Sequence, residues 1–216
     1  MTRVTIVGTS HIAPASIEAA KKTIIRLKPD CVAIELDPER YAALKSKRRE
    51  KASLRNPMYF VLNNLQTHLG HRTGMLPGSE MLTAVETARS VNARIVLIDM
   101  DIAEIMGRLG AISRWEKFKL VFKLLVGMIP WPGNEEINLE KVPPERVIEQ
   151  ALSWMHRELP DIYNVLITDR NAYMADWVRE LSKQYKNIVV VVGAGHRHGL
   201  EKLLKQKPKN VRRLKR

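Results

Sequence analysis

The chain has 216 residues, 45% of them hydrophobic, and a formal net charge of +13 from 36 Lys and Arg against 23 Asp and Glu. This length favours one domain over residues 1–216 that buries its own core. Cys31 is the only cysteine, which excludes an intrachain disulfide framework and fits a reducing compartment, so we expect a cytoplasmic protein. No run of about 18 apolar residues occurs, and a stable membrane span is therefore not expected.

The basic residues concentrate in two segments, 45–55 and 202–216. A positive field attracts phosphate backbones, anionic lipid or acidic ligands. Few aromatic residues accompany these segments, although aromatic rings are what bases stack on in many nucleic-acid-binding proteins. We therefore interpret segment 45–55 as solvated surface and segment 202–216 as a frayed basic tail, and we consider nucleic-acid binding unlikely.

Four apolar, β-branched runs predict buried strands, at residues 4–7, 31–36, 94–98 and 187–192. Their hydrophobicity is continuous rather than alternating, and helical patterns separate them. The first three strands should therefore be parallel and joined by helical crossovers. The fold class predicted is α/β, with a mostly parallel central sheet flanked by helices.

Helix signals occur between these runs. Pro14 suits a first helical turn and Pro29 ends that helix, while Asp37 before Pro38 is typical of a cap followed by a first helical residue. A further helix begins near Ser79. It places five apolar residues on one face: Met81, Ala84, Val85, Ala88 and Val91.

Residues 103–142 are expected to form a helical insertion. Within it, segment 115–129 is apolar but interrupted by three lysines, and it is too short to span a bilayer. We interpret this segment as an amphipathic element that covers the site or forms a homodimer contact. Docking on a membrane surface is the alternative.

Two Gly-x-x-His motifs follow strands at opposite ends of the chain. Residues 8–11 (Gly-Thr-Ser-His) follow the first strand, and residues 193–196 (Gly-Ala-Gly-His) follow the last. In an open parallel sheet the loops at the carboxyl ends of the strands share one edge, where ligands usually bind. His11 and His196 are therefore expected to converge if the two strands run the same way.

Acidic residues recur at the same edge, Glu35 and Asp37 after the second strand and Asp99 and Asp101 after the third. Asp37 and Asp101 also have a structural interpretation as helix caps. Glu35 and Asp99 each end an apolar run, where burial without a partner would be costly. Glu35 either belongs to the site or pairs with Arg40.

Near the C-terminus, an apolar helical stripe contains a carboxylate. Asp169 falls within the stripe Ile162, Val165, Leu166, Tyr173, Trp177 and Leu181, and Arg170 lies beside it. A carboxylate on a buried face should be paired or functional. Asp169 and Arg170 are therefore either a structural ion pair or part of the site.

Two histidines with nearby carboxylates suit a divalent metal such as zinc, manganese or cobalt, which could activate water for hydrolysis. Taken together, five ordered segments resemble the TraB family, whose wider relatives include the metal-dependent Tiki proteases: residues 8–11, 34–37 with Arg40, 77–81, 99–101 and 192–199. Residues 169–174 resemble another family motif, with both of its acids altered. The resemblance implies that His11 and His196 are metal ligands and that Glu80 is an acidic site residue. Glu80 is otherwise a favourable charge at a helix N-terminus.

The leading hypothesis is a metal-dependent hydrolase, possibly a peptidase, in which His11, His196 and either Glu80 or Glu35 hold the ion. A protein that binds or sequesters a peptide without a metal is the alternative, because the TraB family includes pheromone-shutdown proteins. The expected ligand in both cases is a peptide or another small molecule. The expected assembly is a homodimer formed through the apolar insertion.

Overall fold

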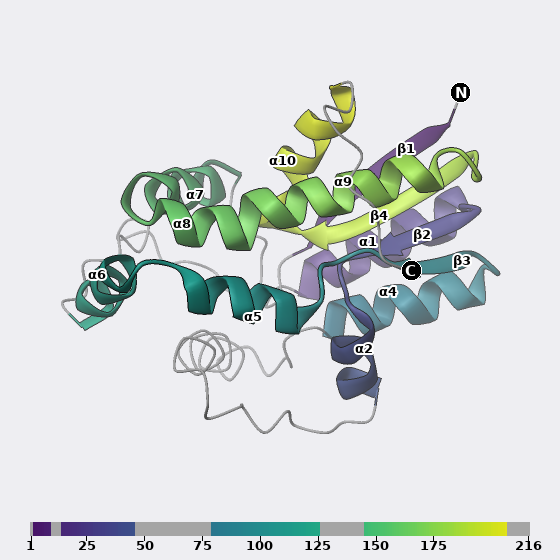
Figure 1. The fold of residues 1–216 in the computed structure, drawn as a ribbon. Helices are drawn as coiled ribbons and strands as arrows, with labels where there is room; N and C mark the ends of the chain where they lie inside the picture. The colour runs from purple at the N-terminus through teal and green to yellow at the C-terminus, as the bar shows by residue number, and fades with distance from the viewer. Residues whose placement is uncertain (1, 10–13, 46–78, 126–144, 207–216) are drawn as a thin grey trace.

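The computed structural model describes residues 2–9, 14–45, 79–125 and 145–206 (Figure 1). At its centre lies a four-stranded parallel sheet in the order β1-β4-β2-β3. The strands are β1 (Arg3–Thr9), β2 (Cys31–Ile34), β3 (Arg94–Leu97) and β4 (Asn187–Gly193). All four predicted strands form, and the α/β prediction is confirmed.

The two central strands differ from the two at the edges in burial. Every residue of β2 is buried, as is β4 from Ile188 onward, whereas most of β1 and β3 is only half-buried. A strand with helices on both faces and neighbours on both sides has no route to solvent, which is why the central runs are continuously apolar. The last strand in the sequence is therefore a central strand of the sheet.

Helices cover both faces of the sheet. On one face, α1 (Pro14–Leu27) and α4 (Ser79–Ser90) pack their apolar sides on β2 and β4, and α2 (Pro38–Lys45) lies beside α4. On the other face, α9 (Asp169–Leu181) and α10 (Ala194–Lys205) form the second core with the alternate residues of the same strands. The predicted stripe of α4 is confirmed, with Val91 packed at the margin of this core. Residues 202–205, predicted to fray, instead form the last turn of α10.

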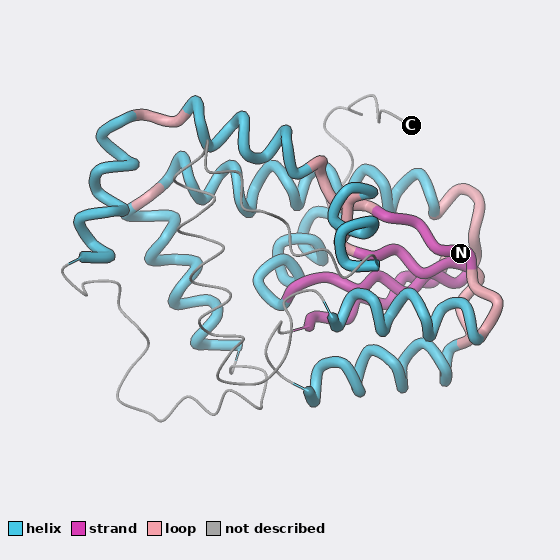
Figure 2. Tube along the Cα trace, turned by 90° about the horizontal axis from the view of Figure 1, so that it is seen from below, coloured by secondary structure: helices cyan, strands magenta, loops and turns pink. Residues whose placement is uncertain are grey.

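Four helices extend beyond the carboxyl ends of the strands: α5 (Ile102–Ala111), α6 (Arg114–Leu125), α7 (Glu145–Glu158) and α8 (Pro160–Tyr163). We refer to these four helices as the helical part, and both Figure 1 and Figure 2 show it beside the sheet. These helices have a core of their own, to which α5 contributes Ile105 and Leu109 and α8 contributes Ile162, with residues of α6 and α7 packed against it. Within the described part of the chain, no helix has both the length and the apolar character needed to cross a bilayer.

A π-helical turn, η1 (Asn164–Thr168), joins α8 to α9 and changes which residues face the core. A π turn contains one more residue than an α turn, so the residues after it are displaced by one position around the helix. The buried face of α9 accordingly includes Asn171, Met174, Ala175, Val178 and Leu181. Asp169 is half-buried, with 27% of its side chain exposed, rather than fully buried as an unbroken α-helical period predicts.

Candidate functional site

The first and last strands end side by side. β1 and β4 are parallel neighbours, with Thr9 opposite Gly193, so the expectation that both Gly-x-x-His motifs start from one edge of the sheet is confirmed for the strands. Gly8 allows β1 to lie close to the start of α10, because a Cβ at this position would lie 3.3 Å from the Cα of Ala194. His11 follows Thr9 by two positions and lies outside the described residues.

His196 lies in the first turn of α10, directly after β4, and only 5% of it is exposed. Its Nδ1 is 2.8 Å from Oδ1 of Asn171, a buried residue of α9. An amide oxygen only accepts hydrogen bonds, so this contact assigns the proton to Nδ1 when the ring is neutral. The Nε2 atom then presents a lone pair, which is the form of histidine that binds a metal.

Gly199 makes room for the side chain that orients His196. A Cβ at this position would lie 2.4 Å from Nδ2 of Asn171, well inside contact distance. Any larger residue at position 199 would therefore displace Asn171. The sequence shows that Gly199 follows His196 by about one helical turn. Nothing in the sequence indicated that Asn171 would be the hydrogen-bond partner of His196.

Glu35 connects β2 to this histidine. It lies just beyond the end of β2, is 4% exposed, and accepts a hydrogen bond at Oε2 from the backbone N–H of Gly193 at 2.6 Å. Its Oε1 accepts a hydrogen bond from Nη2 of Arg170 and lies 3.4 Å from Nε2 of His196. Glu35 is therefore held from three directions, by β4, α9 and α10.

Arg170 joins Glu35 to Asp99. Its Nε and Nη2 donate to the two oxygens of Asp99 at 2.9 and 2.8 Å, and its Nη1 donates to the carbonyl of Leu166 at 3.2 Å. Burial by itself lowers the pKa of this guanidinium, but the charges of Asp99 and Glu35 outweigh it and raise the pKa above the ordinary arginine value. Arg170 therefore remains a cation at neutral pH.

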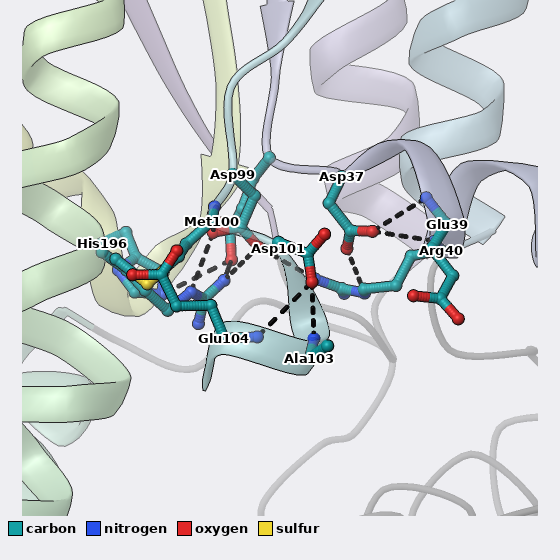
Figure 3. A network of polar contacts seen from close by, with 11 residues as sticks. Asp37, Glu39, Arg40, Asp99, Met100, Asp101, Ala103, Glu104 and His196 are labelled. Carbon is teal, nitrogen blue, oxygen red and sulfur yellow. Dashed lines mark hydrogen bonds and ion pairs between the residues drawn. The ribbon is translucent and has the colours of Figure 1, made fainter. Parts of the chain in front are cut away.

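Arg40 approaches Asp99 from α2. Its Nη1 lies 2.9 Å from Oδ2 of Asp99. The sequence had offered Glu35 as the partner of Arg40, and the structure pairs Arg40 with Asp99 instead. Figure 3 shows Asp99 between His196 on one side and Asp37 with Arg40 on the other. The side chain of Arg40 is 27% exposed against 12% for Arg170, so it is the more accessible of the two guanidinium groups.

Asp37 caps α2 as predicted, with Oδ1 accepting the backbone N–H groups of Glu39 at 2.9 Å and Arg40 at 3.0 Å. Its Oδ2 is buried and has no hydrogen-bond partner among the described residues, and Nε of Arg40 is 3.9 Å away. Burial raises the pKa of this carboxyl above its ordinary value, and the hydrogen bond from Arg40 N–H opposes the change only in part. Asp101 is also confirmed as a cap, accepting from Ala103 N–H at 2.7 Å.

We refer to Glu35, Asp37, Arg40, Asp99 and Arg170 as the edge cluster. When all five groups are ionised, three carboxylates and two guanidinium groups leave a formal charge of −1 beside His196. A buried excess of negative charge favours an added proton or cation. The described residues contain no group of three His, Cys, Asp or Glu side chains placed to hold a metal ion. The pair of His196 and Glu35 supplies two donors of the type that such an ion prefers.

The two remaining residues that the sequence predicts for the site are Glu80 and Asp169. Glu80 is completely buried in the first turn of α4, which packs against β2. Asp169 pairs with Nη1 of Arg108 at 2.7 Å and lines an open surface depression between α5 and η1. Of the two alternatives for these residues, the ion pair between Asp169 and Arg170 does not form, because Asp169 pairs with Arg108 and Arg170 pairs with Asp99 and Glu35.

These features define an α/β protein in which buried, charge-paired side chains and one oriented histidine meet at the carboxyl edge of a parallel sheet. The sequence model of the TraB/PrgY/gumN family matches residues 1–213. The chain therefore belongs to the TraB/PrgY/gumN family.

The chain is similar to proteins from archaea and mammals. It is 32% identical over 215 residues to the protein MJ1365 of Methanocaldococcus jannaschii, covering 93% of this chain and 53% of that protein. It is 26% identical over 236 residues to the TraB domain-containing proteins of Homo sapiens and Mus musculus, covering 93% of this chain and 62% of each of them. The chain thus spans between about half and three fifths of the length of these relatives.

Proposed function

We propose that this protein is a metal-dependent hydrolase whose centre is built on His196 and Glu35. The observation that carries the proposal is the 3.4 Å approach of His196 Nε2 to Glu35 Oε1 in a buried setting, with the opposite ring nitrogen held by Asn171. With the neutral ring protonated at Nδ1, Nε2 and the carboxylate oxygen both present lone pairs, so a proton or a cation between them would be stabilised by both. We assign that place to a divalent ion.

The separation of the two donors suits a shared ion. Bonds of about 2.0 to 2.2 Å at a tetrahedral angle place two ligand atoms roughly 3.3 to 3.6 Å apart. His196 and Glu35 would hold the metal, and His11 is our candidate for a third ligand because its motif starts from the neighbouring strand. When bound, a divalent ion lowers the pKa of a coordinated water and polarises a substrate carbonyl.

The surrounding residues have positioning and binding roles in this proposal. Arg170 and the N–H of Gly193 fix the two oxygens of Glu35, so that the carboxylate does not rotate away from His196. Arg40 is the accessible guanidinium of the edge cluster, and it is suited to bind a carboxylate or the negative charge that develops on a carbonyl oxygen. A peptide has both groups, in agreement with the substrate class that the family resemblance implies.

The test is metal binding and peptide cleavage by matched histidine variants. Purified protein is titrated with Mn²⁺, Co²⁺ and Zn²⁺ by calorimetry, and cleavage of a mixed peptide library is followed by mass spectrometry with and without chelator. The variant His196→Gln removes the proposed ligand. His198→Gln is its control, because His198 is exposed on the same helix only two residues away.

We expect His196→Gln to lose metal affinity and peptide cleavage and His198→Gln to keep both. Asn171→Ala should weaken metal binding by about 10- to 100-fold, the usual effect of removing the partner that orients a metal-binding histidine. Peptide binding without cleavage that persists in chelator would instead establish the sequestering function. Binding of nucleic acid that weakens steeply with salt would instead indicate a nucleic-acid-binding protein, which the sequence made unlikely. An unchanged His196→Gln variant contradicts the proposal.

A further inference from the structure

Helix α6 presents a stripe of aromatic side chains to solvent. Trp115, Phe118 and Phe122 are 64%, 57% and 51% exposed. Their spacing of three and four residues places them on one helical face, and their rings stack, with centroids 5.6 Å apart for the first pair and 6.1 Å for the second. Most proteins expose large apolar side chains singly, so three adjacent ones indicate a surface that contacts something.

The opposite face of α6 is anchored to the protein. Glu116 is 6% exposed and accepts the backbone N–H of Ile162 at 3.0 Å, and Leu120 packs against the core of the helical part. The N–H of Glu116 is in turn bonded to Oγ of Ser113 at 3.1 Å. The rotation of α6 about its axis is therefore set by buried contacts, and these contacts hold the aromatic stripe outward.

The charge of α6 restricts which partner fits the stripe. The helix sequence, RWEKFKLVFKLL, contains four basic residues and one acidic residue, and the acidic one is the buried Glu116. Arg114 is exposed, and Nζ of Lys119 lies 5.9 Å from the centroid of the Trp115 ring, so positive charge borders the aromatic side chains. A symmetric contact between two copies would bring these like charges together. An anionic surface is complementary to them.

We propose that α6 docks the protein on an anionic phospholipid surface. Trp115, Phe118 and Phe122 enter the boundary between headgroups and acyl chains, while Arg114 and Lys119 contact lipid phosphates. Exposed aromatic residues bordered by basic ones are the composition of helices that lie in the plane of a membrane interface. The proposal does not depend on the metal or on hydrolysis. Figure 1 places α6 in the helical part, at the end remote from the sheet.

The test measures binding to vesicles of defined composition. Wild-type protein is mixed with vesicles of phosphatidylcholine alone or of phosphatidylcholine with about a quarter phosphatidylglycerol, and the bound fraction is measured by flotation. The test variant is Trp115→Ser with Phe118→Ser and Phe122→Ser, all at exposed positions. The control is Ile25→Ser, which removes a 45% exposed apolar side chain from α1. Circular dichroism verifies that each variant is folded.

We expect wild type and Ile25→Ser to bind the anionic vesicles, with partitioning at least about tenfold lower for the triple variant. Binding should also weaken between about 50 and 300 mM salt, because the attraction to lipid phosphates is screened. Brominated lipids should quench wild-type tryptophan fluorescence more than that of Trp115→Phe. The proposal is overturned if wild type ignores anionic vesicles or if the triple variant binds as wild type does. It is also overturned if the only effect of the triple substitution is to convert a dimer to a monomer in sedimentation.

Discussion

Asp169 and Arg170 are neighbours in the chain, yet they belong to two ion-pair systems of different character. Arg170 is part of the edge cluster, where the side chains of Asp99 and Glu35 are 0% and 5% exposed. Asp169 pairs with Arg108 in the helical part, where the two side chains are 27% and 37% exposed. Water screens the pair of Asp169 and Arg108 more than the contacts of Arg170 with Asp99 and Glu35. At similar distances between the charged atoms, the buried contacts of Arg170 should therefore be the stronger ones.

The two ion-pair systems also differ in which parts of the protein they hold in place. In the edge cluster each charged group fixes the next, so the position of Glu35 beside His196 depends on Arg170 and Asp99. The Arg108 system, which also includes Glu104, connects α5 to α9 beside an open surface depression. We therefore expect substitutions in the first system to affect stability and the site together, and substitutions in the second to have small effects.

Arg170→Met should give the largest effect. It leaves the carboxylates of Glu35 and Asp99 buried without their shared partner, which typically costs about 3 to 5 kcal/mol of unfolding free energy. Urea denaturation at neutral pH measures this loss. A loss below about 1 kcal/mol would mean that the edge cluster contributes no more to stability than a surface ion pair does.

Gly199→Ala should have the next largest effect. The new Cβ collides with Asn171, and forcing that side chain to move should cost roughly 1 to 3 kcal/mol, more than the helix propensity gained. The His196 imidazole resonances in NMR spectra should shift as its Nδ1 partner is lost. Gly195→Ala is the matched control, because its Cβ would meet only Leu152, at 3.9 Å. It should be neutral or stabilising by up to about 1 kcal/mol.

Substitutions of Asp37 should show how much the negative charge of its buried carboxylate destabilises the protein. Asp37→Asn keeps an oxygen for the cap and removes the charge, so stability at neutral pH should not fall, whereas Asp37→Ala should lose about 1 kcal/mol with the cap. The folded-state pKa of Asp37 is raised above 3.8. Its proton-linked stabilisation is therefore complete below pH 3.8 and is lost as the pH rises through the folded-state pKa. Denaturation midpoints of wild type relative to Asp37→Asn should decrease over that interval.

Arg108→Met should have the smallest effect. The side chain is 37% exposed, so the contacts with Asp169 and Glu104 are screened by solvent and worth at most about 1 kcal/mol. Denaturation at low and high salt should show the small difference decreasing as salt is added. A loss as large as that of Arg170→Met would show that the two systems are energetically alike.

Much of the fold and part of the site could be predicted from local patterns. The four β-branched runs and the caps at Asp37 and Asp101 appear where expected, because strand burial and capping depend on residues close together in the chain. The carboxyl-edge rule predicted that the motifs after β1 and β4 would share an edge if the two strands ran the same way, but it did not predict that these strands are neighbours. The partner of each charged group could not be predicted, because pairs such as Arg170 with Glu35 and Asp99 join residues far apart in the sequence.

The sequence by itself determined which segments become strands and helices and which edge of the sheet collects histidine and carboxylate side chains. Only the tertiary structure decided the rotation of α9, because the single extra residue of the π turn at 164–168 has no periodic signature. That rotation directs Arg170 and Asn171 toward the edge of the sheet and leaves Asp169 with Arg108. A helical period is a local property, whereas the choice of partner depends on how distant elements pack.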